Sequence, residues 1–218
     1  MTANEVIAIA KASELYQISP AVKDDTATLV GFLNLGLLEL YKRFQLKTDE
    51  AIITLQEAKT IYSLDGTDPD VELGDDFMYL IAAYGDESDS VYSYTDEGLL
   101  SINVEDDIYG INTISYNKIQ VPLITSGSLI SIIYAAKPTM VTALTLDNEL
   151  DIPDSFVDPL IHYIGYRAHA SLDSTLQTEN NVHYMRFEQA CDNARQLGVG
   201  IAPDDIEMNR RLDDRGFV

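Results

Sequence analysis

The sequence predicts an α+β fold in which helical segments at both ends of the chain flank a β-rich middle. Two observations predict it: apolar residues recur at helical spacing near each end, and short β-branched segments with turn signals lie between them. We expect a discontinuous helical bundle domain from residues 1–49 and 150–198. Residues 50–149 would form a β-rich insertion domain, and residues 199–218 an extended C-terminal arm.

The first helical stripe follows a short helix predicted over residues 3–15. Its members recur at steps of three or four, namely Leu29, Leu33, Leu37, Leu40 and Phe44. Asp24 or Asp25 can cap the helix that carries the stripe. Gly31 and Gly36 lie inside this helix, where each glycine costs about 1 kcal/mol relative to alanine. Such glycines predict that another segment packs closely against the helix backbone.

The second helical region begins after Pro153 and Asp154, which are helix-start signals. Its apolar residues are spaced by four, namely Phe156, Leu160, Ile164, Ala168 and Leu172. A last helix follows and ends at Gly198. We expect the two stripes to face each other, because two amphipathic faces at the chain ends have no other obvious partner.

The middle of the chain has the composition of β-strands. Ala51–Leu55 and Thr60–Leu64 predict a hairpin, and Phe77–Tyr84 is apolar enough for either a buried strand or a helical turn. Ile114–Val121 and Leu129–Tyr134 predict two further strands joined through a Ser-Gly turn. Residues 85–110 predict a long acidic excursion.

The chain is strongly acidic, with 36 Asp and Glu against 14 Lys and Arg and a formal net charge of −22. Such a field repels phosphate groups, which disfavours a protein that reads or wraps nucleic acid. The same charge suits either plain solubility or a passage through which DNA slides without sticking. No apolar run reaches the about 18 residues of a membrane span, and the start lacks signal-peptide features, so we expect a protein made and used in solution, with no membrane partner.

The residue types that carry catalysis or bind metals form no recognisable motif. His162 and His169 are seven residues apart, about 10 Å along a helix, which is too far for one helix to chelate a metal, and His183 opens the next helix. We interpret all three as helix-surface or interface histidines. The acids of DGTDPD (residues 65–70) lack the order of a calcium loop and predict a solvated acidic loop. The lone Cys191 predicts a small buried apolar residue. We therefore predict no catalytic residue, no cofactor and no metal site.

Tyrosine is the aromatic residue that this chain favours, with 13 Tyr and no Trp. Tyr163, Tyr166 and Tyr184 lie close in sequence to Arg167 and Arg186, and this composition is typical of protein contact surfaces. The alternative is that these tyrosines border the core with their hydroxyls in water. Candidate interface residues on the C-terminal arm are Arg210, Arg211, Leu212, Arg215 and Phe217. This arm either orders on binding or stays a solvated tail.

Several segments together resemble the head-to-tail adaptor (connector) proteins of tailed bacteriophages, in particular those with short tails. They are LVGFLNLGLLELYKRF, YNKIQVPL, SLISIIYAAKP, DSFVDPLIHYIGYRAHASLD and NNVHYMRFEQACDNAR. The resemblance spans residues 25–198. It implies a structural virion component of the neck or tail, made in the host cytoplasm and without catalytic activity.

The resemblance also implies partners. These are the portal protein, a tail protein of the nozzle or tube, copies of the chain itself in a ring of twelve, and DNA that passes through the ring during ejection. The arm would clasp portal or a neighbouring subunit. Two alternatives stay open from the residues alone: an acidic monomeric binding module, and a hydrolase-like enzyme with an acid–histidine site.

Overall fold

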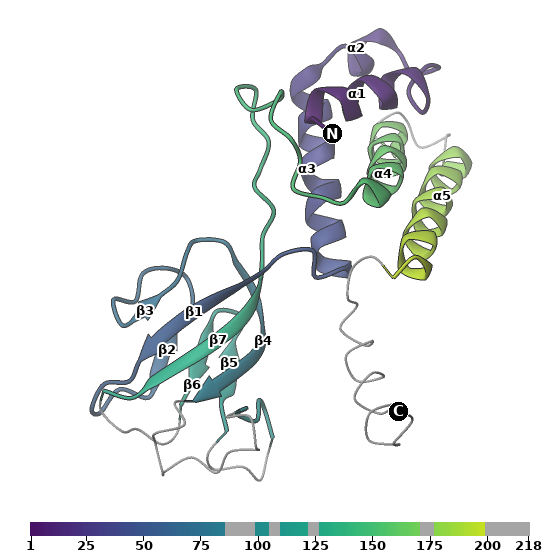
Figure 1. Cartoon of the computed structure of the whole chain (residues 1–218). Helices are drawn as coiled ribbons and strands as arrows, with labels where there is room; N and C mark the ends of the chain where they lie inside the picture. The colour runs from purple at the N-terminus through teal and green to yellow at the C-terminus, as the bar shows by residue number, and fades with distance from the viewer. Residues whose placement is uncertain (86–98, 105–109, 122–126, 171–176, 199–218) are drawn as a thin grey trace. The chain divides into compact units, whose positions relative to one another are not determined.

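The computed structural model describes residues 1–85, 99–104, 110–121, 127–170 and 177–198 (Figure 1). Within the described residues the chain forms two compact units. The helical unit comprises Met1–Leu46 and the described part of Pro138–Val218, and the β unit comprises Lys47–Lys137. Helices at both ends and a β-rich middle confirm the predicted α+β class. The units divide after residues 46 and 137, whereas the predicted insertion domain spans residues 50–149.

The helical unit contains five α-helices and one 3-10 turn among its described residues. They are α1 (Ala3–Ala12), α2 (Pro20–Lys23), α3 (Thr26–Arg43), η1 (Asp154–Phe156), α4 (Val157–Ala170) and α5 (Gln177–Gln196). The first helix begins with a capping box between Thr2 and Glu5. Of the two predicted caps of α3, Asp25 is the one used, and its side chain accepts hydrogen bonds from the backbone N–H groups of Ala27 and Thr28.

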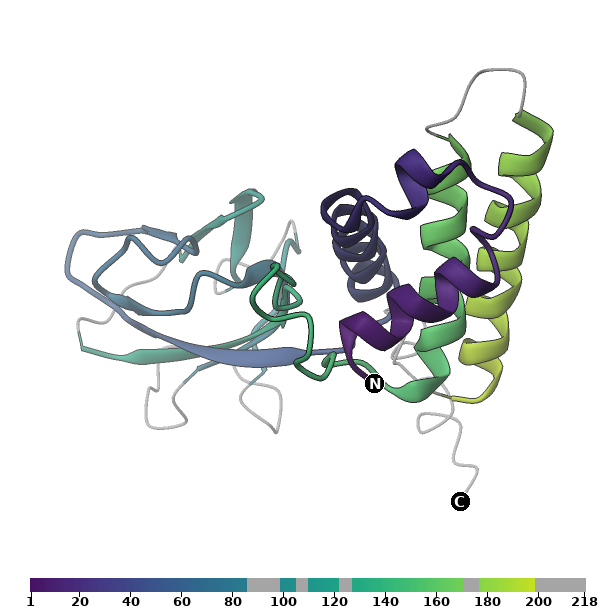
Figure 2. The ribbon, with the colours of Figure 1, turned by 90° about the horizontal axis from the view of Figure 1, so that it is seen from above.

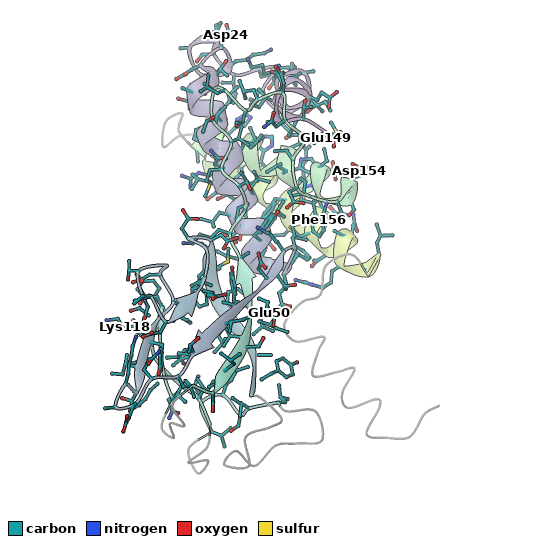
Figure 3. The ribbon with its side chains drawn as sticks, turned by 60° about the vertical axis from the view of Figure 1, so that its left-hand side comes forward. Asp24, Glu50, Lys118, Glu149, Asp154 and Phe156 are labelled. Carbon is teal, nitrogen blue, oxygen red and sulfur yellow. The ribbon has the colours of Figure 1, made fainter. Side chains whose placement is uncertain are left out.

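The two predicted stripes share one buried core, in which α3 packs on α4. Leu33, Leu40, Phe156, Leu160 and Ile164 are fully buried, and Leu37 is 2% exposed. Phe156, labelled in Figure 3, meets the ring of Phe44 edge-on at a centroid distance of 4.7 Å. Figures 1 and 2 show α5 beside α4, and the buried Phe187 of α5 joins the same core.

Close approach of α4 to α3 explains Gly36. A Cβ atom at this position would lie 2.6 Å from Cδ1 of Leu160 and 3.0 Å from Cδ1 of Tyr163. Gly31 differs, because no atom lies within 4 Å of its Cβ position. The predicted close packing is therefore confirmed at Gly36 and wrong at Gly31, which faces open space.

The described residues of the β unit form two antiparallel sheets. The four-stranded sheet has the order β3-β1-β7-β4 and the three-stranded sheet the order β2-β6-β5. The strands are β1 (Thr48–Thr54), β2 (Ile61–Ser63), β3 (Val71–Glu72), β4 (Phe77–Gly85), β5 (Asn112–Ser115), β6 (Lys118–Gln120) and β7 (Leu129–Ala136). Side chains from both sheets form a single core, whose largest members include Tyr62, Ile53, Ile130 and Ile132.

The strand pairing differs from the sequence prediction in two places. The predicted hairpin between Ala51–Leu55 and Thr60–Leu64 is wrong, since β1 pairs with β3 and β7 while β2 pairs with β6. The segment predicted as one strand over Ile114–Val121 is instead a hairpin of β5 and β6, which turns at Tyr116 and Asn117. Residues 77–85 form a strand rather than a helical turn. Most of the predicted acidic excursion, residues 86–98 and 105–109, lies outside the described residues.

Candidate interaction surface

Aromatic side chains gather along α4 and α5, and we call Tyr163, Tyr166, Tyr184 and Phe187 the aromatic face. The rings of Tyr163 and Phe187 are 5.2 Å apart, as are those of Tyr166 and Tyr184. Tyr163 and Tyr166 meet at 5.9 Å, because residues three apart share one side of a helix. Phe187 is fully buried and Tyr184 is 38% exposed, so the face runs from the core to the surface.

Arg43, in the last turn of α3, ties the aromatic face to two carboxylates. Its Nε donates to Oε1 of Glu39 at 2.8 Å, and its Nη1 donates to the carboxylate of Glu188 at 2.9 Å. The guanidinium also lies 4.9 Å from the ring centroid of Phe187. Partial burial opposes the charge, but hydrogen bonds to Glu39, Tyr184 and Glu188 raise the pKa of Arg43. The aromatic face is thus bordered by the charged guanidinium of Arg43, which is paired with the carboxylates of Glu39 and Glu188.

The structure brings together only some of the predicted interface residues. Tyr163, Tyr166 and Tyr184 lie on one face, and Arg167 is half-buried. Arg186 points elsewhere: its Nη1 lies 3.6 Å from Oε2 of Glu14. The arm candidates Arg210, Arg211, Leu212, Arg215 and Phe217 lie outside the described residues. The sequence analysis missed Arg43 and Glu188, which are 145 residues apart and share no local pattern.

The histidines differ from their predicted environment, since His169 is buried and His162 and His183 are largely buried. All three lie around Glu14, a residue of the loop after α1 that the sequence analysis did not single out. A helix-surface interpretation is wrong because this loop covers the faces of α4 and α5 that carry the histidines. Among the residues that the structure describes, no group of three or more His, Cys, Asp or Glu side chains could hold a metal ion.

The acids of residues 65–70 differ from the predicted solvated loop at one position. Asp68 has a side chain only 8% exposed and accepts a hydrogen bond from Nζ of Lys59 at 2.6 Å. The same ammonium group donates to Asp70 at 2.6 Å. The ammonium group of Lys59 therefore pairs with the carboxylates of both Asp68 and Asp70.

Cys191 confirms the prediction of a small buried side chain, at 2% exposure. Burial raises the pKa of its thiol to about 12. Since the thiolate is the reactive form, Cys191 is inert near neutral pH. It fills space between α5 and the rest of the helical core.

The described residues thus form a helical unit from both chain ends, a β unit between them, and an aromatic face on the helical unit. In a comparison with protein families, the family model described as SU10 adaptor protein matches residues 1–205. The chain belongs to this family. It is a family of phage head-to-tail adaptors, so this adaptor is a structural component of a bacteriophage.

The family match covers both units and ends within the predicted arm. A comparison with curated proteins gives no match to this adaptor. Among its described residues, none of the helices has the length and apolar character needed to cross a membrane.

Proposed function

We propose that this adaptor assembles as a ring of twelve copies. This ring joins the portal to a tail nozzle or tube protein in the virion neck. The observation that carries the proposal is the family match over residues 1–205. The helical and β units would be its two functional domains, and it would act without catalysis or cofactor.

The charge supports a further part of the proposal, that the ring continues the DNA channel. Each copy carries a formal net charge of −22, and a ring multiplies this field. A negative lumen makes few attractive contacts with phosphates, so DNA slides during ejection instead of binding. The purified adaptor should accordingly show no retention of duplex DNA at physiological salt, and tight, salt-sensitive retention would contradict this part.

The aromatic face is the surface that we assign to the portal or to a neighbouring copy. Tyrosine and arginine are enriched among residues that dominate binding energy, and they act best where a buried base holds them rigidly. Here the buried Phe187 lies beneath Tyr163 and next to Tyr184. A face of this kind presents rigid rings with a partly exposed edge.

The arm is proposed as a second contact. The family match ends at residue 205, so most of the arm lies beyond it and its role rests on the sequence. Leu212 and Phe217 would enter pockets on the portal or on a neighbouring copy. Arg210, Arg211 and Arg215 would pair with carboxylates, to which the arginine fork binds through two hydrogen bonds.

Co-sedimentation with the portal ring of the same phage tests the joining function. We expect the adaptor to sediment with portal, with a mass increment that corresponds to twelve copies. The double variant Tyr166→Ala with Tyr184→Ala should weaken this association by tenfold or more, on the order of one hot-spot pair. Tyr116→Ala is the matched control, because Tyr116 lies in the β unit and is 85% exposed. Absence of sedimentation with portal would contradict the proposal.

Deletion of residues 203–218 tests the arm separately. The truncated adaptor should keep the unfolding midpoint of the full chain, because the deletion removes no described core residue. Its co-sedimentation with portal should be lost. Unchanged affinity for portal would leave the aromatic face as the main contact and remove the arm from the proposal.

A further inference from the structure

All three histidines of this chain contact one buried glutamate, two at its carboxylate and one at its backbone oxygen. Glu14 lies in the loop between α1 and α2, and its side chain is only 8% exposed. Its Oε1 is 3.3 Å from Nδ1 of His162, and its Oε2 is 2.5 Å from Nδ1 of His183. Its backbone oxygen is 3.1 Å from Nε2 of His169. One loop residue therefore contacts α4 twice and α5 once.

The helices leave space for this loop. A Cβ atom at Gly165 of α4 would lie 2.9 Å from Cβ of Glu14, so glycine is what lets the loop approach. Leu15 is fully buried and Ile18 is 6% exposed, and both belong to the helical core. The loop is thus held by the buried side chains of Leu15 and Ile18 and by the carboxylate of Glu14, which precedes them in the chain.

The protonation states at neutral pH follow from these contacts. His169 donates from Nε2 to the backbone oxygen of Glu14, since a carbonyl only accepts. The His169 ring stacks on His183 at 4.2 Å, and two positive charges at this distance repel. Burial, followed by the proximity of His169, lowers the pKa of His183, although the contact with Glu14 opposes this shift. The contact with His162 lowers the pKa of Glu14 despite burial. Glu14 is therefore ionised and His183 neutral.

We propose that Glu14, His169 and His183 form an acid-released latch that holds residues 13–18 against α4 and α5 at neutral pH. The latch is a property of the helical unit and does not depend on the proposed function. The titratable and charged groups around it are Glu14, Asp158, His162, His169, His183 and Arg186. Arg186 is 52% exposed and Asp158 is 72% exposed, so water screens both more than it screens Glu14.

The direction of the pH effect can be worked out from His183. Its pKa in the closed state lies below the ordinary value of 6.5, so the open state binds more protons as the pH falls. The closed state therefore loses stability below about pH 6.5. Glu14 has a lowered pKa, so its contribution persists above its ordinary value of 4.5 and is lost only in stronger acid. Between pH 7.5 and 5.5 the imidazole of His183 controls the latch.

His162 also lies against this loop. Its Nδ1 is 3.3 Å from Oε1 of Glu14, and its Nε2 lies 3.5 Å from Oδ1 of Asp158. The close pairs at Glu14 Oε2, His162 Nδ1 and His183 Nδ1 are not aligned as hydrogen bonds.

Hydrogen exchange of the full chain, corrected for the intrinsic pH dependence of exchange, tests the latch. The amides of Leu15 and Ile18 are hydrogen-bonded to Ala10 and Leu15 and report on the loop. Their protection should fall between pH 7.5 and 5.5, by up to about tenfold, because pH 5.5 lies one unit below the ordinary imidazole pKa and the open state can gain no more than that from protonation of one histidine. Amides of Ile130 and Ile132 in the β unit should keep their protection.

Two variants assign the effect. His183→Gln should abolish the acid response of the loop. Glu39→Gln is the matched control, because it removes a carboxylate paired with Arg43 but far from any histidine contact, and its response should equal that of the unmodified chain. Equal loop protection at both pH values, or a full response in His183→Gln, would overturn the proposal. If a variant fails to fold, NMR titration of the unmodified chain decides: a His183 pKa at or above 6.5 would overturn the latch.

Discussion

The helical unit and the β unit both contain buried or partly buried carboxylates, but different bases contact them. In the helical unit Glu14 meets imidazoles, whereas in the β unit Asp68 and Asp76 meet the ammonium groups of Lys59 and Lys47. Lysine stays charged throughout the physiological range and histidine does not. The choice of base therefore predicts that the helical unit responds to mild acid and that the β unit does not.

The acids of the β unit illustrate the resistant arrangement. Asp76 accepts hydrogen bonds from Nζ of Lys47 at 3.0 Å and from the hydroxyl of Tyr134 at 2.9 Å. Partial burial opposes ionisation, but the contacts with Lys47 and Tyr134 lower the pKa of Asp76. Partial burial also opposes ionisation of Asp68, but hydrogen bonds from Lys59 and from the backbone N–H groups of Ser63 and Asp70 lower its pKa. Such groups titrate only in strong acid.

The largest expected effect sharpens the separation of the two cores, which share no residue. Leu37→Ala should destabilise the helical unit by about 2–5 kcal/mol, because the side chain is 2% exposed and leaves a cavity. Ile132→Ala is its counterpart in the β unit, where Ile132 is fully buried. Denaturant unfolding followed by hydrogen exchange should place each loss in its own unit. Equal loss in both units from either variant would mean that the two cores unfold together.

A smaller effect concerns the contact of α3 with α4. Gly36→Ala should cost about 1–3 kcal/mol, because the new methyl group would overlap Leu160 at a site with no free space. Gly31→Ala is the matched control on the same helix. Its position is open, so it should gain up to about 1 kcal/mol from helix propensity. Opposite shifts in the thermal midpoint are expected, and shifts of the same sign would contradict the close packing.

The smallest expected effect tests whether the β unit resists mild acid, in contrast to the helical unit. Asp68→Asn should cost about 1–3 kcal/mol at neutral pH, because it weakens the acceptor for three donors. The pKa of Asp68 is lowered, so its contribution is present above the ordinary value of 3.8 and lost as the pH falls through the folded value. The cost should thus be constant from pH 7.5 to 5.5 and shrink near pH 3. A cost that changes between pH 7.5 and 5.5 would show that the β unit is also sensitive to mild acid.

The helices could be predicted from the sequence, whereas the pairing of the strands could not, for a physical reason. A helical stripe such as Leu33, Leu37 and Leu40 depends on neighbours three or four residues away. Strand partners are remote: Tyr62 of β2 is opposite Ile119, and Ile53 of β1 is opposite Ile130. Nothing local distinguishes these pairs from the predicted hairpin, so existence of strands was predictable while their pairing was not.

The candidate surface divides in the same way. Tyr163 and Tyr166 could be named as contact candidates from composition alone, and they lie together because residues three apart share one side of a helix. Arg43, Glu188 and Glu14 contribute to the two polar clusters through contacts between distant segments, which no spacing rule reveals. These contacts became visible only when α3, α4 and α5 were placed in space.

The paired ends of the β unit carry a consequence for how such adaptors diversify. The chain enters this unit at Lys47 and leaves it at Lys137, and the two connections are held together where Ala136 N donates to Lys47 O at 3.0 Å and Thr48 lies opposite Ala135. An insertion whose entry and exit are adjacent can be exchanged, enlarged or replaced by a short linker without repositioning the flanking helices. Recombination between phages could therefore trade this module as a cassette while the helical frame is inherited unchanged.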